Sequence, residues 1–238
     1  MPGATKARRR TAGARAPKSL GSYLDRIRND PAEFRTVSRT VNPLDFDVTA
    51  VLGHLNQRRE YPTVQFNNPL DLHGKPSRFP IVTNLWGTRE RCAEAIGLPR
   101  SEAGARLGSL LCDRIDRKVK PVVVSGKAAP VQANVLKGKK ADLWMFPAVR
   151  HFEMDLGAVL TMGMIAKPPG EDFYNITFVK AFPETGSRAG LTVHTVHMSR
   201  ILGEWEQRRE RCRVAYVLGH HPGFWLGTLN NTPWGDNE

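Results

Sequence analysis

The feature that most constrains the fold is a change of hydrophobic pattern near residue 120. Before it, apolar residues recur at helical spacing in several runs, interrupted by short strand-like segments. After it, alternating runs are separated by glycine and proline. We therefore expect an α+β protein in which a mixed N-terminal part is followed by a β-rich part.

The N-terminal part, residues 18–120, is expected to be an α/β domain. Thr88 stands where a helix N-cap belongs, and Gly97 stands where that helix should end. The patterns predict helices over residues 19–28, 46–59 and 89–96, and strands over residues 34–41, 63–66 and 79–85.

The C-terminal part, residues 121–238, has the strand spacing of a β-barrel or sandwich, and we expect mainly antiparallel structure there. One charged helix is expected over residues 200–211, followed by a buried strand over 214–218. The other predicted strands are residues 121–125, 131–136, 159–165, 173–179 and 191–197.

Half of the formal net charge of +12 lies in the first 18 residues, which contain six Lys and Arg and no acid. We predict that residues 1–17 form a disordered basic tail, because they have almost nothing apolar to bury. The tail lacks the apolar core of a secretory signal, and a solvated tail is favoured over a transit peptide. A basic tail also raises nucleic acid as a partner, but we do not expect the protein to bind nucleic acid.

The three cysteines, Cys92, Cys112 and Cys212, are far apart and form no CxxC pair. We therefore expect neither disulfides nor a thiolate zinc site, and interpret each cysteine as a small core residue in a cytoplasmic protein. No stretch reaches the roughly 18 apolar residues of a membrane-spanning helix, so no membrane partner is expected.

Candidate metal ligands occur late in the chain. Asn175, the pair His194 and His197, and Glu238 supply oxygen and nitrogen donors of the kind suited to manganese or magnesium. The alternative stays open that Asn175 is a polar group at a strand end, the histidines are half-exposed strand residues and Glu238 is a mobile terminus.

A second histidine pair, His220 and His221, lies between Gly219 and Pro222. That context is typical of a turn, so we favour a loop role over metal binding. The chain contains no GxGxxG, P-loop, GxSxG or HExxH motif.

Several segments together resemble the UbiD-like family of prenylated-FMN-dependent decarboxylases. TVQFNNP at residues 63–69 and PIVTNLWGTRER at 80–91 are similar to that family's F-x-N-P and N-L-F-G-T-x-E-R segments. Residues 175–180 resemble the strand that carries a metal-binding Asn, and 190–197 the strand that ends in a metal-binding His. Residues 214–219 with Pro222 resemble the strand and turn before the cofactor loop, and NTPWGDNE at 231–238 resembles the P-x-G-x-x-E segment.

The resemblance implies a split β-barrel of the flavin-reductase type over residues 121–238, with prenylated FMN, Mn²⁺ or Mg²⁺, and K⁺ as an optional further ion. It assigns the metal ligands to Asn175, His197 and Glu238, and leaves His194 as structural. The positions that it places at the flavin are Thr177, Phe178, Val179, Lys180, Val196 and Asn230.

Two departures from the family pattern matter. Lys180 stands where the family has an Arg that contacts the substrate carboxylate; lysine keeps the charge but loses the bidentate fork. We expect Lys180 to be the catalytic residue of this segment. The family's acid–base Glu residues would lie beyond Glu238, so the resemblance implies a second subunit that supplies the C-terminal half of the fold.

The implied function is that of a carboxy-lyase subunit acting reversibly on an aromatic or α,β-unsaturated carboxylic acid. Two alternatives stay open. The chain could be a non-catalytic scaffold or regulator that retains a relict cofactor site, or a basic nucleic-acid-binding protein that uses its tail.

Overall fold

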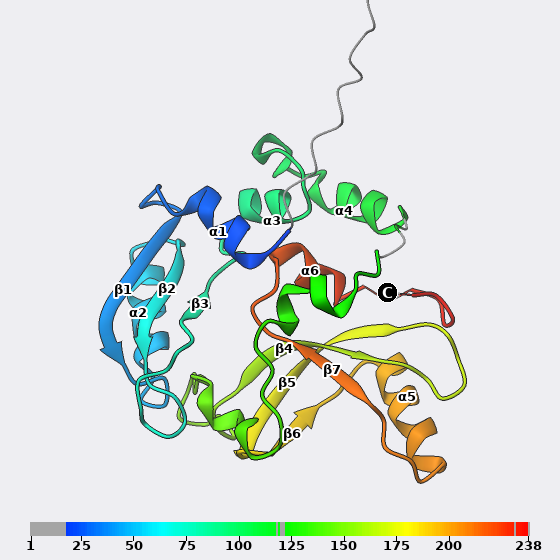
Figure 1. Cartoon of the computed structure of the whole chain (residues 1–238). Helices are drawn as coiled ribbons and strands as arrows, with labels where there is room; N and C mark the ends of the chain where they lie inside the picture. The colour runs from blue at the N-terminus through cyan, green and yellow to red at the C-terminus, as the bar shows by residue number, and fades with distance from the viewer. Residues whose placement is uncertain (1–17, 118, 120–121, 231, 238) are drawn as a thin grey trace, which may run out of the picture.

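The computed structural model describes residues 18–117, 119, 122–230 and 232–237. The prediction of a disordered tail over residues 1–17 and the ligand assignment of Glu238 fall outside these ranges. Within them, two separate β-sheets are joined and covered by helices (Figure 1).

The first sheet has the order β1-β2-β3. β1 and β2 run parallel, with Phe34 opposite Thr63, and β3 is antiparallel to β2. Helix α2 connects the parallel pair, and its buried Val48 and Leu55 belong to the same apolar cluster as Phe66 of β2. The bounds are β1 Phe34–Val41, α2 Asp47–Gln57, β2 Thr63–Pro69 and β3 Ile81–Thr83.

Further helices belong to this half of the chain, and the predicted helices and strands of the first 100 residues are confirmed. The side chain of Ser19 caps the first helix and that of Thr88 caps the third, as predicted for Thr88. The bounds are α1 Leu20–Ile27, α3 Arg89–Ala95, the short 3₁₀ helix η1 Arg100–Glu102, and α4 Leu107–Ile115.

Arg91 of α3 is fully buried and joins α3 to the chain around the first sheet. Its guanidinium donates to Glu33 Oε2 at 2.9 Å and to the carbonyls of Leu85 and Asn84 at 3.3 Å each, and also to the Tyr61 carbonyl. A buried guanidinium is tolerated only when its donors are satisfied, so this network fixes the position of α3.

The second sheet has the order β6-β5-β4-β7, and all of its pairs are antiparallel. Helix α5 packs on one face through Met198 and Ile201, whereas Phe224 of α6 approaches Gly163 on the other face. The bounds are β4 Leu160–Ala166, β5 Asn175–Thr185, β6 Arg188–Thr192, α5 Val196–Gln207, β7 Val214–Val217 and α6 Pro222–Gly227.

The antiparallel arrangement of this sheet agrees with the prediction, but the barrel does not. In the described part of the chain the sheet stays open and closes into no barrel, with β6 and β7 as its two edges. The expected split barrel is therefore not confirmed. The edge strand β7, expected to be buried, has two half-buried end residues and two exposed middle residues, because an edge strand is covered less well than a central one.

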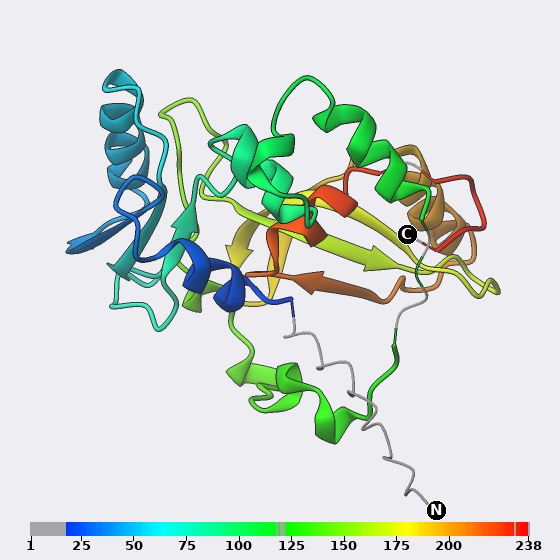
Figure 2. The ribbon, with the colours of Figure 1, turned by 90° about the horizontal axis from the view of Figure 1, so that it is seen from above.

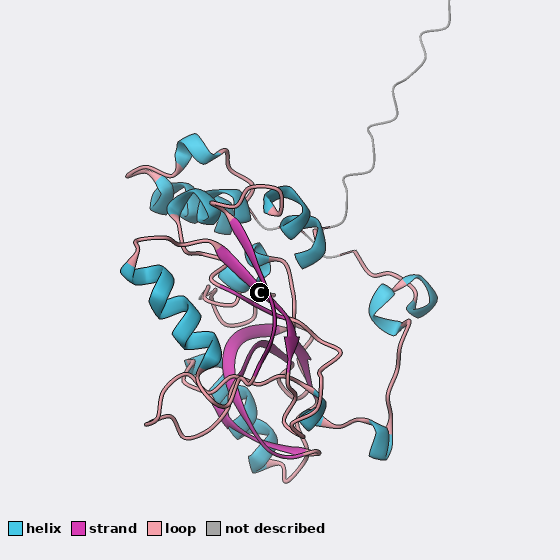
Figure 3. Ribbon diagram, turned by 90° about the vertical axis from the view of Figure 1, so that its left-hand side faces the viewer, coloured by secondary structure: helices cyan, strands magenta, loops and turns pink. Residues whose placement is uncertain are grey.

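The strands predicted over residues 121–125 and 131–136 are wrong for the residues described there. Residues 122–141, called the exposed arm below, are exposed except for the half-buried Ala129, and they run outside both sheets (Figures 2 and 3). Valine-rich sequence favours a strand only where a partner strand and a packing surface are present. The arm has short 3₁₀ turns instead: η2 Gly126–Ala128, η3 Pro130–Gln132 and η4 Gly138–Lys140, with η5 Leu143–Met145 following it.

The strand predicted over residues 191–197 ends early. β6 stops at Thr192 and α5 begins at Val196, so His197 lies in the first turn of a helix and not on a strand. The apolar residues Met198 and Ile201 are three apart, a helical spacing, and both are fully buried, which stabilises the helix over this stretch.

The cysteines differ in their exposure. Cys92 and Cys212 are partly buried, but Cys112 on α4 is exposed, which contradicts its interpretation as a core residue. Among the helices of the described ranges, none has the length and apolar character needed to cross a membrane.

Replacing Arg91 by Ala should lower the free energy of unfolding by about 3 to 5 kcal/mol, because it leaves Glu33 and several carbonyls without their buried donor. Urea titration followed by circular dichroism measures the change. The control is Arg26→Ala, which removes a half-exposed ion pair with Glu94 and should cost less than about 1 kcal/mol. Equal losses in the two variants would contradict the structural role of Arg91.

Candidate functional site

The pleat of β5 separates the predicted site residues into two groups. Asn175, Thr177 and Val179 are buried, with exposed fractions of 4%, 1% and 1%, on the face that α5 covers. Phe178 and Lys180 point to the opposite face, because successive side chains of a strand alternate. A flavin lying on that opposite face would therefore meet Phe178 and Lys180 and not Thr177 or Val179.

A hydrogen bond joins β5 to the start of α5. The hydroxyls of Thr177 and Thr195 lie 2.9 Å apart. Thr177 is two residues after Asn175, and Thr195 is two residues before His197. The bond therefore links the two elements that carry Asn175 and His197. These elements are a strand and a helix, whereas two strands were expected.

The C-terminal segment, residues 232–237, packs against the same two elements. Trp234 meets His197 edge to face, with ring centroids 5.4 Å apart, and meets Phe173 in the same manner at 5.2 Å. The guanidinium carbon of Arg200 lies 3.8 Å from the centroid of the Trp234 ring. Trp234 thus contacts both the first two turns of α5 and the residues just before β5.

A second contact fixes the end of this segment. The backbone N–H of Tyr174 donates to the Asn237 side-chain oxygen at 2.8 Å. Tyr174 directly precedes Asn175, and Asn237 directly precedes Glu238. Although Glu238 itself is outside the described residues, its neighbour in sequence lies against the neighbour of Asn175.

The donors fit a hard divalent ion as far as they are described. Asn175 offers an amide oxygen and His197 an imidazole nitrogen, a mixed set that manganese and magnesium accept. No three His, Cys, Asp or Glu side chains gather as a ligand set in the described part of the chain. The triad with Glu238 therefore stays a prediction.

The other predicted flavin positions lie in different surroundings. Phe178 packs on Trp225 of α6 with ring centroids 4.5 Å apart, and Lys180 is exposed. Val196, the first residue of α5, is 80% exposed and directly precedes His197. These three side chains are accessible to a ligand, whereas Thr177 is engaged with Thr195.

Asn230 lines a groove of about 620 Å³ between α4 and α6. Lys18, Arg114 and Arg117 also line it and give it a positive potential. The sequence offered no signal for these cations, because they lie more than 110 residues from Asn230 and reach the groove only through tertiary packing.

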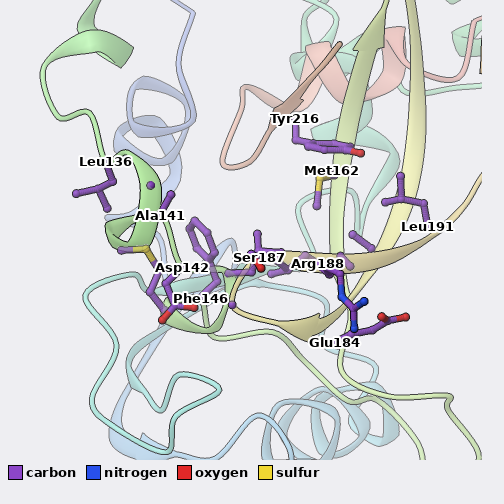
Figure 4. Close-up of a pocket in the computed structure, with 17 residues that line it drawn as sticks. Leu136, Ala141, Asp142, Phe146, Met162, Glu184, Ser187, Arg188, Leu191 and Tyr216 are labelled. Atoms are coloured by element: carbon purple, nitrogen blue, oxygen red, sulfur yellow. The ribbon is translucent and has the colours of Figure 1, made fainter. Parts of the chain in front are cut away.

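A second, apolar pocket of about 820 Å³ opens between the sheet and the end of the exposed arm (Figure 4). Leu136 and Phe146 form one side, and Met162 and Tyr216 lie across from them. Neither Asn175 nor His197, the two predicted metal ligands in the described part of the chain, lines it. The pocket is therefore separate from these two predicted ligands, although buried residues of the apolar cluster under α5 form part of its wall. Its charged lining residues are Asp142, Glu184 and Arg188.

His220 and His221 occupy the turn before α6, in keeping with a loop role. The N–H of Gly223 donates to Nδ1 of His221 at 3.0 Å, which caps α6. Burial lowers the pKa of both imidazoles, and the positive charges of Lys18 and Arg26 lower the pKa of His221 further. Both rings are thereby kept neutral to lower pH than an exposed histidine.

Comparison with known families identifies the class of the protein. Residues 29–111 match the N-terminal domain of 3-octaprenyl-4-hydroxybenzoate carboxy-lyase, and residues 122–238 match the Rift-related domain of the same enzyme family. The chain belongs to the UbiD family.

Solved structures of this class share the fold. The UbiD-class enzyme HmfF from Pelotomaculum thermopropionicum, in an evolved dimeric form in complex with prFMN, superposes with a TM-score of 0.79 at 23% identity. That match covers 93% of this chain and 49% of HmfF. Vanillic acid decarboxylase from Sedimentibacter hydroxybenzoicus, in its closed form, gives a TM-score of 0.81 at 23% identity over 94% of this chain and 47% of its own.

Among curated relatives, anhydromevalonate phosphate decarboxylase from Methanothermobacter thermautotrophicus is 24% identical over 160 residues, which cover 67% of this chain and 36% of the relative. The chain thus spans half or less of the length of the proteins it matches. The family and the fold follow from these matches, and activity, substrate and partners are treated below as proposals.

The two histidines before α6 predict how stability depends on pH. Their pKa is lowered in the folded state, so the unfolded chain binds more protons below the ordinary histidine pKa of about 6.5. Stability should therefore be fully present above about pH 7 and fall as the pH drops toward 5. Urea midpoints measured across this range test the expectation.

The variant His221→Asn keeps a side-chain acceptor at the cap and removes one titrating group, so it should flatten the profile. The exposed His54 on α2 provides the control, because His54→Asn touches neither histidine of the turn. A wild-type midpoint that rises on acidification would contradict the role assigned to the pair.

Proposed function

We propose that this chain is a subunit of a UbiD-type decarboxylase that acts reversibly on an aromatic or α,β-unsaturated carboxylic acid and uses prenylated FMN. The observation that carries the proposal is the convergence of three separate segments. The strand of Asn175, the helix of His197 and the C-terminal segment are joined by the Thr177–Thr195 hydrogen bond and the contacts of Trp234.

Asn175, His197 and Glu238 would hold a Mn²⁺ or Mg²⁺ ion, with K⁺ as an optional further ion. A divalent ion held by oxygen donors and one imidazole neutralises the charge of a cofactor phosphate. The prenylated flavin supplies the electron sink when bound, and the protein contributes binding and orientation.

Lys180 would bind the substrate carboxylate. It is exposed on the face of β5 that also presents Phe178, so one ligand on that face can reach both side chains. A lysine offers a point charge without the planar fork of arginine, which holds a carboxylate less rigidly. We expect the substrate to rely on its apolar or aromatic part for orientation.

A second chain would bind to this one and contribute to the active site. The exposed arm and the apolar pocket beside it support this part of the proposal. Val122 and Val123 are 87% and 94% exposed, and surfaces of this kind mark protein contacts. The arm carries four lysines and no acid, which favours a partner with an acidic face.

Metal and cofactor loading tests the ligand assignment. In the co-purified complex, His197→Ala should reduce bound manganese and flavin absorbance by about tenfold or more, since it removes the only nitrogen ligand. The matched control is His194→Ala, an exposed histidine three residues upstream that should leave both unchanged. Metal analysis and the visible spectrum are the measurements. Equal loading of the complex in wild type and His197→Ala would remove the assignment.

Partner binding tests the role of the arm. The substitution Val123→Asp should abolish co-purification of the chain that accompanies the wild type, because it places a charge in the contact. The melting temperature of the isolated chain should not change, since Val123 is almost fully exposed. Tyr61→Asp, which alters an exposed apolar residue beside the first sheet, is the control. Undiminished recovery of the partner with Val123→Asp would exclude the arm as the docking surface.

A further inference from the structure

Trp234 sits at the meeting point of all three segments of the candidate metal site. Its indole is partly buried against the apolar cluster beneath α5. The imidazole of His197 packs edge to face against one side of the indole. Phe173 closes another side of the indole. The residue therefore combines a core anchor with direct contact to a predicted metal ligand.

Arg200 also contacts the indole of Trp234. Its guanidinium lies over the ring at 3.8 Å, well within the range of a cation–π interaction. The guanidinium is itself oriented by Glu204, whose Oε1 accepts from Arg200 Nε at 2.8 Å one turn further along α5. A continuous chain of contacts thus runs from Glu204 through Arg200 and Trp234 to His197.

This chain of contacts constrains the imidazole of His197. In the first turn of a helix a histidine side chain has several accessible rotamers, and ordering it costs conformational entropy. Packing against Trp234 limits the ring to orientations that keep the edge-to-face contact. A ligand that is already ordered binds a metal more tightly, because less entropy is lost on binding.

We propose that Trp234 is a positioning residue that holds the His197 imidazole in its metal-binding orientation, with Arg200 and Glu204 holding Trp234 in turn. This inference rests on the metal site proposed above. It assigns a role to three residues outside the ligand set, two on α5 and one in the C-terminal segment.

The test uses the full 238-residue chain and Mn²⁺ alone, followed by NMR of the histidine ring protons. Substoichiometric Mn²⁺ broadens the signals of nearby rings even when binding is weak and exchange is fast. His197→Gln identifies the His197 signal among the seven histidines. In the wild type, Mn²⁺ should broaden this signal more than those of the other histidines.

Trp234→Leu should shift the His197 signal in the absence of metal, because the ring current of the indole is lost. It should also weaken Mn²⁺ binding by about tenfold, the usual effect of removing a supporting contact behind a metal ligand. Trp234→Phe keeps an aromatic face and should restore part of both effects. Arg200→Met, which removes the cation, should fall between the wild type and Trp234→Leu.

The control is Trp205→Phe, which changes another tryptophan on the same side of the sheet whose indole donates to Lys167 and not to the site. It should leave the His197 signal and Mn²⁺ binding unchanged. If Mn²⁺ broadens the His197 signal in the wild type and broadens it equally in Trp234→Leu, the positioning role alone is overturned. If the leucine variant fails to fold, equal broadening in Trp234→Phe and Arg200→Met has the same consequence. No selective broadening of His197 in the wild type overturns the metal site itself and, with it, the proposed function.

Discussion

The pleat of β5 is the constraint on which the rest of the second sheet depends. β5 pairs with β4 on one side and β6 on the other, so each of its side chains points to one face of the sheet or to the opposite face. One face is closed by α5 and buries Asn175 and Thr177, and the opposite face leaves Lys180 exposed. This division separates a face suited to holding an ion at the strand end from a face suited to meeting a ligand.

The candidate site is built at the boundary of these layers from segments that are distant in sequence. The Thr177–Thr195 hydrogen bond fixes the helix to the strand, and Trp234 and Asn237 fix the C-terminal segment to both. Each contact is small by itself, since a single hydrogen bond or ring contact contributes about 1 kcal/mol. Together they place Asn175 and His197 on adjoining elements and hold the described C-terminal segment against both.

Predictions from sequence succeeded where structure is local. The cap at Thr88 and the apolar spacing of α1 and α2 depend on residues within a few positions, and these elements lie where they were expected. They failed where a strand needs a partner. The valines of the exposed arm and the residues before His197 have strand-like patterns. Among the described residues no strand pairs with the arm, and the apolar residues Met198 and Ile201 stabilise a helix beginning at Val196.

The sequence by itself indicated the family, because the segments NLWGTRER and NTPWGDNE resemble family segments in the order of their residues, and that order can be read without the fold. The sequence also supplied the candidate metal ligands, Asn175, His197 and Glu238. Only the tertiary structure decided that the sheet stays open over the described residues, that His197 belongs to a helix, and that Trp234 contacts both His197 and Arg200. The physical reason is that pattern and spacing describe neighbours along the chain, whereas strand pairing and side-chain contact between residues 175, 197 and 234 depend on packing across it.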